Sequence, residues 1–232
     1  MTGGTSMEPF KAAIFDLDGV IVDTARFHFL AWKRLAEELG FEFTEKDNER
    51  QKGVSRMESL EVLLEVGGIT DLSPEKKEEL ATKKNEWYKE YLYEMTPADI
   101  LPGAKDFLKY LRLRNIKVAL ASASKNAPII LEKLNIKDLF DAVVDGNSVS
   151  KAKPDPEVFL KAAEQLGIDP SECFVFEDAQ AGVEGAKRAG MRVVGIGQQE
   201  ILNKAEIVIN GFPEIEPVVL LSHIHPKTGI CR

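Results

Sequence analysis

Short apolar runs that end in polar residues recur along the chain and alternate with longer helical patterns. The run at residues 12–15 is too short for a helix and suits a buried strand, and it leads into Asp16, Asp18 and Gly19. Three further runs share this form, and the polar residues that follow them are Ser122, Asp145, Glu177 and Asp178. The alternation is typical of an α/β protein with a Rossmann-like parallel sheet, in which the carboxyl ends of the strands meet at one edge. We therefore expect the first two aspartates to converge with Ser122 and Asp178.

The same pattern predicts the remaining elements of the sheet. The predicted strands are 12–15, 117–121, 142–145, one that begins at Cys173, 192–196 and 207–209. Four helices are predicted between these strands: one that ends near Arg114, one that includes 129–134, one from Asp155 to Gly167, and one over 179–189. The tail from Phe212 onward holds three prolines and little periodicity, so no element is predicted there.

A long helical segment follows the first strand. Apolar residues recur at helical spacing within 27–39, 57–64 and 80–92, and Gly40 is placed to end the first of these helices. Ser55 precedes the second helix, and Ser73 is placed to cap the third. Residues 23–96 are therefore expected to form an inserted helical cap domain. Residues 1–22 and 97–232 are expected to form the α/β core, with hinges near 22–24 and 96–98.

Composition and charge narrow the class of protein. The chain has 232 residues, of which 44% are hydrophobic and 29% charged, as in an ordinary globular protein. Its net charge of −8 argues against a nucleic-acid-binding surface, and its two cysteines make no disulfide framework. Residues 1–7 have neither the basic start nor the apolar stretch of a signal peptide, and no run approaches the roughly 18 apolar residues that span a membrane. We expect a cytoplasmic protein without nucleic-acid or membrane partners, and we leave residues 1–7 out of the fold.

The two aspartates after the first strand are a candidate site. Gly19 allows the backbone to approach a ligand closely, and Asp16 and Asp18 supply two carboxylates at a strand end. The same residues also fit a turn in which an aspartate caps a helix. The pattern alone leaves both interpretations open.

Four motifs in order identify a family resemblance. F-D-L-D-G-V at 15–20, S-A-S-K-N at 122–126, K-P-x-P at 153–156 and E-D at 177–178 together resemble the haloacid dehalogenase-like (HAD) superfamily of phosphoryl-transfer enzymes. The resemblance extends from about residue 10 to residue 197. Within that superfamily, D-T-A-x-x-H-x-x-A-W at 23–32 and K-G-V-S-R at 52–56 are similar to the β-phosphoglucomutase family.

The resemblance implies roles for the acidic residues. Asp16 matches the nucleophile that forms an aspartyl-phosphate, and Asp18 matches the general acid–base residue, although spacing alone allows the two roles to be exchanged. Asp16, Asp18 (through its carbonyl) and Asp178 match the ligands of Mg²⁺, and Glu177 matches a further ligand or a neighbour of one. A pair of N-capping residues for the following helix is the alternative explanation of Glu177 and Asp178.

The resemblance also implies two groups of phosphate-binding residues. Ser122, the backbone N–H of Ala123, and Lys153 match the cradle of the transferring phosphate. The residues that match the distal-phosphate clamp and its surroundings are Lys52, Gly53, Val54, Ser55, Arg56, Ser124, Lys125 and Asn126. His28 and Lys84 match a linked pair near the acid–base residue, although a core histidine is the ordinary explanation of His28 and Lys83 is the neighbouring alternative.

The resemblance therefore implies a mutase. The expected reaction interconverts β-D-glucose 1-phosphate and D-glucose 6-phosphate through β-glucose 1,6-bisphosphate, and the expected protein is a monomer. A phosphatase for small sugar phosphates or phosphoglycolate is the alternative on the same scaffold, with water in place of the second hydroxyl. A non-catalytic sugar-phosphate binder is disfavoured, because a binder has no need of a nucleophile.

Overall fold

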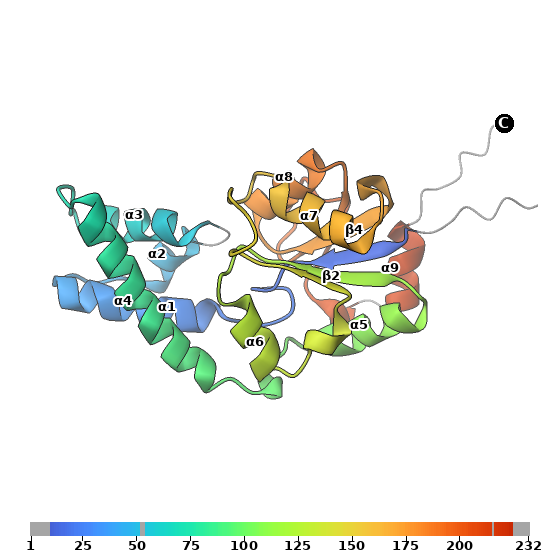
Figure 1. Ribbon diagram of the computed structural model, residues 1–232, viewed down its shortest axis with the longest axis horizontal. Helices are drawn as coiled ribbons and strands as arrows, with labels where there is room; N and C mark the ends of the chain where they lie inside the picture. Colours follow the sequence, from blue (N-terminus) through green and yellow to red (C-terminus); the bar gives the residue numbers. More distant parts are fainter. Residues whose placement is uncertain (1–9, 52–53, 215, 225–232) are drawn as a thin grey trace, which may run out of the picture.

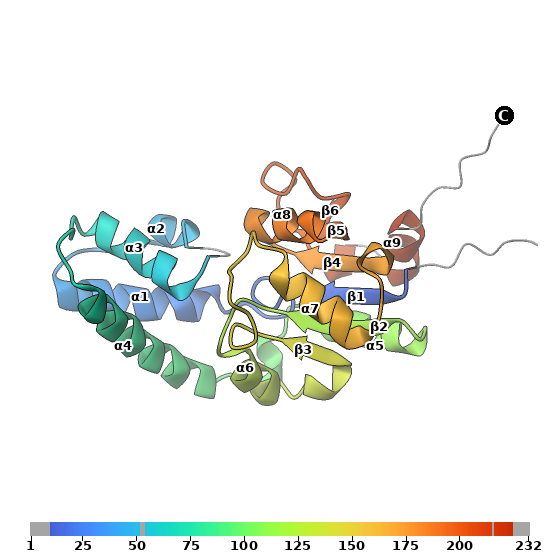
Figure 2. The same cartoon turned by 45° about the horizontal axis from the view of Figure 1, so that its top comes forward.

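A six-stranded parallel sheet forms the centre of the molecule, which the computed structural model describes over residues 10–51, 54–214 and 216–224. The sheet order is β3-β2-β1-β4-β5-β6 (Figure 2). The strands are β1 (Ala12–Phe15), β2 (Lys117–Ala121), β3 (Ala142–Val144), β4 (Cys173–Glu177), β5 (Arg192–Ile196) and β6 (Ile207–Ile209). The chain leaves β1 toward β2 and β3 and then returns to β4 on the other side. Ligands of open α/β sheets bind beyond the strand ends at such a reversal.

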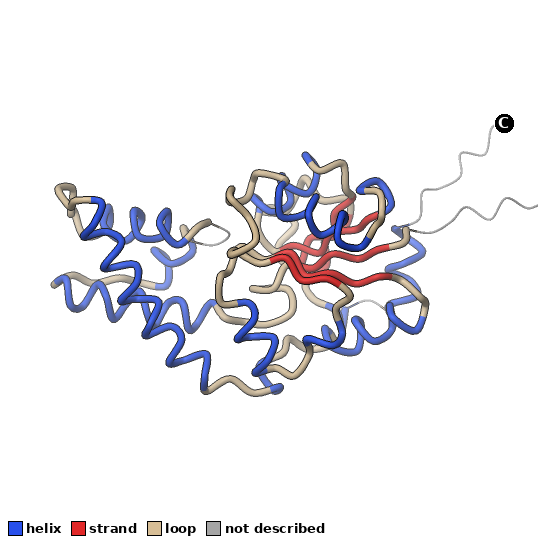
Figure 3. The backbone as a smooth tube through the Cα atoms, in the orientation of Figure 1, coloured by secondary structure: helices blue, strands red, loops and turns tan. Residues whose placement is uncertain are grey.

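Helices cover both faces of this sheet (Figures 1 and 3). α7 (Glu157–Leu166) and α8 (Gln180–Arg188) lie on one face, and α5 (Ala104–Leu113) and α9 (Pro217–Ile224) lie on the other. Alternate side chains of β1 serve the two faces, since successive residues of a strand point in opposite directions. Ala12 and Ile14 pack with α7 and α8, whereas Phe15 stacks on Phe176 at a ring distance of 4.5 Å on the α5 side.

Four helices lie together beyond the carboxyl ends of the strands (Figures 1 and 2). They are α1 (Ala25–Leu39), α2 (Glu45–Glu49), α3 (Arg56–Val66) and α4 (Pro74–Tyr93). The predicted ends are confirmed: Gly40 adopts φ 88° after α1, Ser55 caps α3 in a capping box with Glu58, and Ser73 caps α4. The hydrophobic cluster under α5 continues through residues 17–22 into these helices.

The two connections between the helices and the sheet lie side by side. Val22 bridges Ile100 in antiparallel fashion, and the Leu101 N–H donates to the Ile21 carbonyl at 2.9 Å. Residues 21–22 and 100–101, which border the two predicted hinges, therefore lie side by side.

Most elements of the sheet fall where the pattern predicts them, and two helices were not predicted. α2 begins at a capping box of Thr44 and Asp47, a signal that the sequence contains. α9 forms in the tail after Phe212, with Pro217 as its first residue. The other helices are α6 (Ala127–Lys133) and the 3₁₀ turns Pro97–Asp99, Lys137–Leu139, Pro170–Glu172 and Phe212–Glu214. Within the described ranges, no helix combines the length and apolar character needed to cross a bilayer.

Candidate active site

The turn after β1 presents two carboxylates at the reversal point of the sheet. Asp16 is buried, and its N–H donates to the Phe176 carbonyl on β4 at 2.9 Å. Gly19 adopts φ 79°, a conformation that disfavours side chains, and a Cβ there would overlap the carboxylate of Asp178. The glycine therefore allows the β1 turn and the end of β4 to meet.

Lys153 links the carboxylates of β1 and β4. Its Nζ lies 2.6 Å from Asp16 Oδ1 and 2.8 Å from Glu177 Oε2, and all three side chains are buried. Burial alone would lower the pKa of Lys153, but the charges of Asp16 and Glu177 outweigh burial and raise it. The ammonium is therefore held charged, although a lysine at this sequence position is by default a surface residue.

Asp178 joins the two carboxylates that pair with this ammonium. Oxygens of Asp16, Glu177 and Asp178 lie within 4.8 Å of one another. Burial and the charge of Asp16 raise the pKa of Glu177 to about 7, against the opposing charge of Lys153. Burial and the charges of Glu177 and Asp16 raise the pKa of Asp178 well above its usual range. Mutually repelling carboxylate oxygens, two of them on buried side chains and one on a half-buried side chain, are a donor set that fits a hard divalent cation. The alternative explanation, in which Glu177 and Asp178 cap the following helix, fits only in part. Glu177 accepts the Ala179 N–H at 3.2 Å, but Ala179 itself is the N-cap residue of α8, and no side-chain hydrogen bond caps this helix.

Asp18 lies in a different environment from Asp16. It accepts a hydrogen bond from the Thr24 hydroxyl, at the start of α1. Burial and the charge of Asp16 raise the pKa of Asp18 to about 6, against the opposing effect of Thr24. The pKa of Asp18 therefore lies closer to neutral pH than that of an ordinary aspartate.

His28 and Lys84 meet between α1 and α4. Lys84 Nζ lies 2.9 Å from His28 Nδ1, with the rings of Trp32 and Tyr88 at 4.5 and 4.7 Å. Burial lowers the pKa of both groups, and the charge of Lys84 lowers that of His28 further. The direction of this hydrogen bond follows the protonation of the pair: a charged Lys84 donates to Nδ1, whereas a neutral Lys84 can also accept from an Nδ1–H. The neighbouring alternative, Lys83, instead forms an exposed ion pair with Glu38.

Arg56 lies within electrostatic reach of His28 and Lys84, and also of Glu78 and Glu86. Arg56 is the first residue of α3, is half-buried, and helps to lower the pKa values of His28 and Lys84. A cation at a helix N-terminus is electrostatically unfavourable. A bound anion beside Arg56 would therefore stabilise this end of α3. Val54 and Ser55 are also half-buried, and the Ser55 hydroxyl accepts the Glu58 N–H. Lys52 and Gly53 lie outside the described residues.

The end of β2 supplies the hydroxyl and amide groups of the predicted cradle. The Ser122 hydroxyl is buried and accepts the Ser124 N–H at 3.0 Å, which leaves its own proton to donate. Asn126 donates through Nδ2 to Asn85 Oδ1 at 2.9 Å and so joins α6 to α4. Ala123 is half-buried and Lys125 is exposed.

The sequence did not identify several residues that complete this arrangement. Thr24 stood inside a quoted motif, and its place at a helix start six residues after Asp18 was an available signal. Trp32 stood in the same motif and Asn85 beside Lys84, but their contacts and those of Tyr88 depend on how α1, α4 and α6 pack.

This sheet, with an acidic turn after its first strand and an acidic pair after its fourth, defines the class of protein. A model of the haloacid dehalogenase-like hydrolase family matches residues 10–190. The chain belongs to the haloacid dehalogenase-like family.

Its similarity within the family points to β-phosphoglucomutases. The chain is 48% identical to the β-phosphoglucomutase of Bacillus subtilis over 200 residues, which cover 86% of this chain and 88% of that protein. The crystal structure of a β-phosphoglucomutase from Clostridium difficile matches with a TM-score of 0.88 and 41% identity, over 93% of this chain and 97% of that one. A phosphatase of phosphorylated carbohydrates from Thermotoga maritima is 34% identical, over 91% of this chain and 97% of that protein.

Proposed function

We propose that this enzyme interconverts β-D-glucose 1-phosphate and D-glucose 6-phosphate through an aspartyl-phosphate and β-glucose 1,6-bisphosphate. The observation that carries the proposal is the contrast between its two aspartates. Asp16 is ion-paired with Lys153, whereas the pKa of Asp18 is raised to about 6. Carboxylates whose environments differ in this way suit the separate roles of nucleophile and acid–base residue. This contrast supports the order of roles that spacing left open.

The proposed reaction proceeds in two transfers on the same aspartate. The Asp16 carboxylate attacks the phosphorus in line, while Asp18 gives its proton to the departing sugar oxygen. In the second transfer, Asp18 takes the proton of the accepting sugar hydroxyl, and that oxygen attacks the phosphorus on Asp16. Ser122, the Ala123 N–H and Lys153 would hold the phosphate oxygens. Mg²⁺, held by Asp16, the Asp18 carbonyl, Glu177 and Asp178, would neutralise charge between nucleophile and phosphate.

The helices would bind the phosphate that is not being transferred. The position of Arg56 at the start of α3 supports this assignment, and Ser124, Lys125 and Asn126 would contribute from the sheet side. Residues 23–96 would act as a cap that closes over the site, and His28 with Lys84 would relay closure to Asp18. Monomeric state and a cytoplasmic location stay predictions.

A sugar-phosphate phosphatase is the second candidate. The 34% identity to the Thermotoga maritima phosphatase favours it, since one scaffold serves both reactions. In that case water would replace the accepting sugar hydroxyl.

Asp16→Asn tests the proposed nucleophile. The variant keeps the shape of the side chain but loses the charge that attacks phosphorus, so neither turnover nor a phosphoenzyme is expected. Acid-stable, hydroxylamine-sensitive labelling by acetyl phosphate measures the phosphoenzyme, with wild type as the positive control. Labelling that survives in Asp16→Asn would contradict the assignment.

A further inference from the structure

The loop that carries Lys153 has no regular structure of its own. It runs from the end of β3 to the start of α7, over residues 145–156. Lys153 must nevertheless reach Asp16 and Glu177 at 2.6 and 2.8 Å. Hydrogen bonds within the loop, such as that from the Asp155 N–H to the Ala152 carbonyl, and contacts with neighbouring elements together fix its path.

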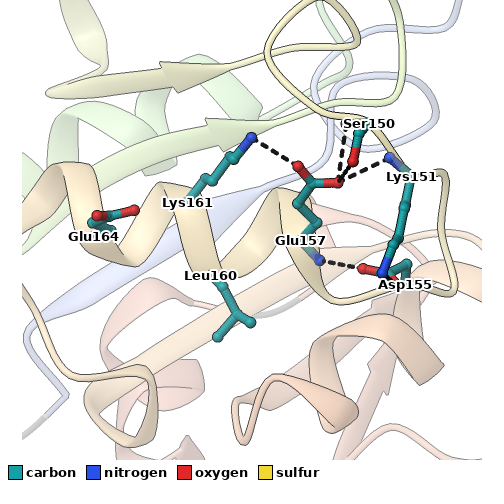
Figure 4. A pocket seen from close by; sticks show the side chains of 7 residues that line it. All are labelled: Ser150, Lys151, Asp155, Glu157, Leu160, Lys161 and Glu164. Atoms are coloured by element: carbon teal, nitrogen blue, oxygen red, sulfur yellow. Dashed lines mark hydrogen bonds and ion pairs between the residues drawn. The ribbon is translucent and has the colours of Figure 1, made fainter.

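The side chain of Glu157 holds this loop at one point (Figure 4). Its Oε2 accepts three hydrogen bonds, from the Ser150 N–H at 3.0 Å, the Ser150 hydroxyl at 2.9 Å and the Lys151 N–H at 2.9 Å. Its Oε1 pairs with Lys161 Nζ at 2.7 Å, and the same Nζ donates to the Ser148 carbonyl at 2.7 Å. One carboxylate thus fixes the loop two residues before Lys153.

The charge of Glu157 suits it to this task. The hydrogen bond from Lys161, together with those from Ser150 and Lys151, lowers the pKa of Glu157 to about 2. An ionised carboxylate accepts stronger hydrogen bonds than a neutral group does.

Glu157 is itself fixed by the core of the molecule. The next residues of α7, Val158 and Phe159, are buried against the sheet, and Lys153 Nζ lies 5.0 Å from the centre of the Phe159 ring. The first turn of α7 therefore supports the Lys153 loop through both a carboxylate and a ring.

We propose that Glu157 is a positioning residue, which holds the 148–153 loop so that the Lys153 ammonium stays between Asp16 and Glu177. The consequence for activity rests on the proposed function, in which Lys153 binds the transferring phosphate. The positional claim does not rest on it.

The accessibility of Lys153 to an amine reagent tests the position directly. Glu157→Ala removes the anchor, and Glu157→Gln keeps one acceptor oxygen but loses the ion pair with Lys161. Trace acetylation, read at each lysine by peptide mass spectrometry, is expected to rise at Lys153 about fivefold or more in Glu157→Ala and less in Glu157→Gln. Glu164→Ala, on the exposed side of the same helix, is the matched control and is expected to leave Lys153 unchanged.

Lys84 is the internal standard for this experiment, because it is equally buried but lies between α1 and α4. A rise at Lys153 alone supports the proposal. No rise at Lys153, or a rise shared by Lys84, overturns it, since the first shows that the anchor is dispensable and the second shows general loosening.

Phosphorylation of Asp16 by acetyl phosphate then tests whether Glu157 acts through Lys153. Glu157→Ala is expected to slow it about tenfold in the wild-type background but less than about twofold when Lys153→Met is already present, because coupled residues are not additive. Equal slowing in both backgrounds overturns the proposal. Wild-type protein that is never phosphorylated would contradict the proposed function instead, and the acetylation of Lys153 would still decide the role of Glu157.

Discussion

At the scale of single residues, the carboxylate of Glu177 occupies space that only a glycine leaves open. A Cβ at Gly182, on α8, would overlap that carboxylate. Glu177 is 1% exposed and is held by Lys153 and the Ala179 N–H, so it has no free direction in which to move. A glycine inside a helix costs about 1 kcal/mol relative to alanine. Gly182 therefore lowers the stability of α8 but leaves room for the Glu177 carboxylate.

Gly182→Ala is therefore expected to harm the site although alanine favours helices. Displacement of the Glu177 carboxylate is expected to weaken Mg²⁺ binding by about tenfold or more, since 1.36 kcal/mol corresponds to a factor of ten. Calorimetric titration with Mg²⁺ measures this affinity without reference to turnover. Lys187→Ala is the control on the same helix, because it removes an exposed side chain that pairs with Glu206 and not with Glu177. Equal affinity in wild type and Gly182→Ala would show that Glu177 is not needed for the cation.

The sequence identified residues that stand in motifs and missed those that act through contacts. Asp16, Lys153 and Glu177 follow strands or lie in a short motif, and the structure brings them together. Gly182 and Glu157 carried no comparable signal, because each acts on a partner from another segment that only packing brings near. Their importance could not be read before the fold was known.

At the scale of elements, the strands were predicted almost to the residue, and α2 and α9 were missed. β2, β5 and β6 match their predicted ranges, since short apolar runs bounded by polar residues leave little freedom of assignment. α2 is only five residues long, too short for a repeating apolar pattern, and its capping box was the remaining signal. α9 was missed because the tail showed little periodicity.

A substitution at the N-terminus of α3 distinguishes the mutase from the phosphatase. Arg56 would make charge-assisted hydrogen bonds to the distal phosphate, worth about 1.5–3 kcal/mol each. Arg56→Ala is therefore expected to lower mutase turnover by about two orders of magnitude, while phosphorylation of Asp16 by acetyl phosphate, which has no distal phosphate, changes by less than about tenfold.

Lys83→Ala is the control for Arg56→Ala, because it removes an exposed cation from α4. Equal losses in both assays of Arg56→Ala would assign Arg56 to the structure or to the transferring phosphate. No loss in either assay would favour the phosphatase.

At the scale of the whole molecule, a sheet edge faces a group of helices across two adjoining connections (Figure 2). The sheet edge carries the acidic residues and Lys153, and the helices carry Arg56, His28 and Lys84. Such a division suits an enzyme that holds one phosphate on each side of a sugar. The family resemblance predicted this architecture, while the Asn85–Asn126 hydrogen bond that joins the two sides emerged only from the structure.

Product balance tests the central claim most directly. Wild-type enzyme with Mg²⁺ is given β-glucose 1-phosphate and a trace of β-glucose 1,6-bisphosphate, and glucose 6-phosphate and free phosphate are followed together. We expect glucose 6-phosphate to appear in step with the loss of substrate, with little free phosphate, because the phosphoryl group on Asp16 returns to a sugar hydroxyl. Free phosphate released in step with substrate loss, without glucose 6-phosphate, would contradict the mutase and establish the phosphatase.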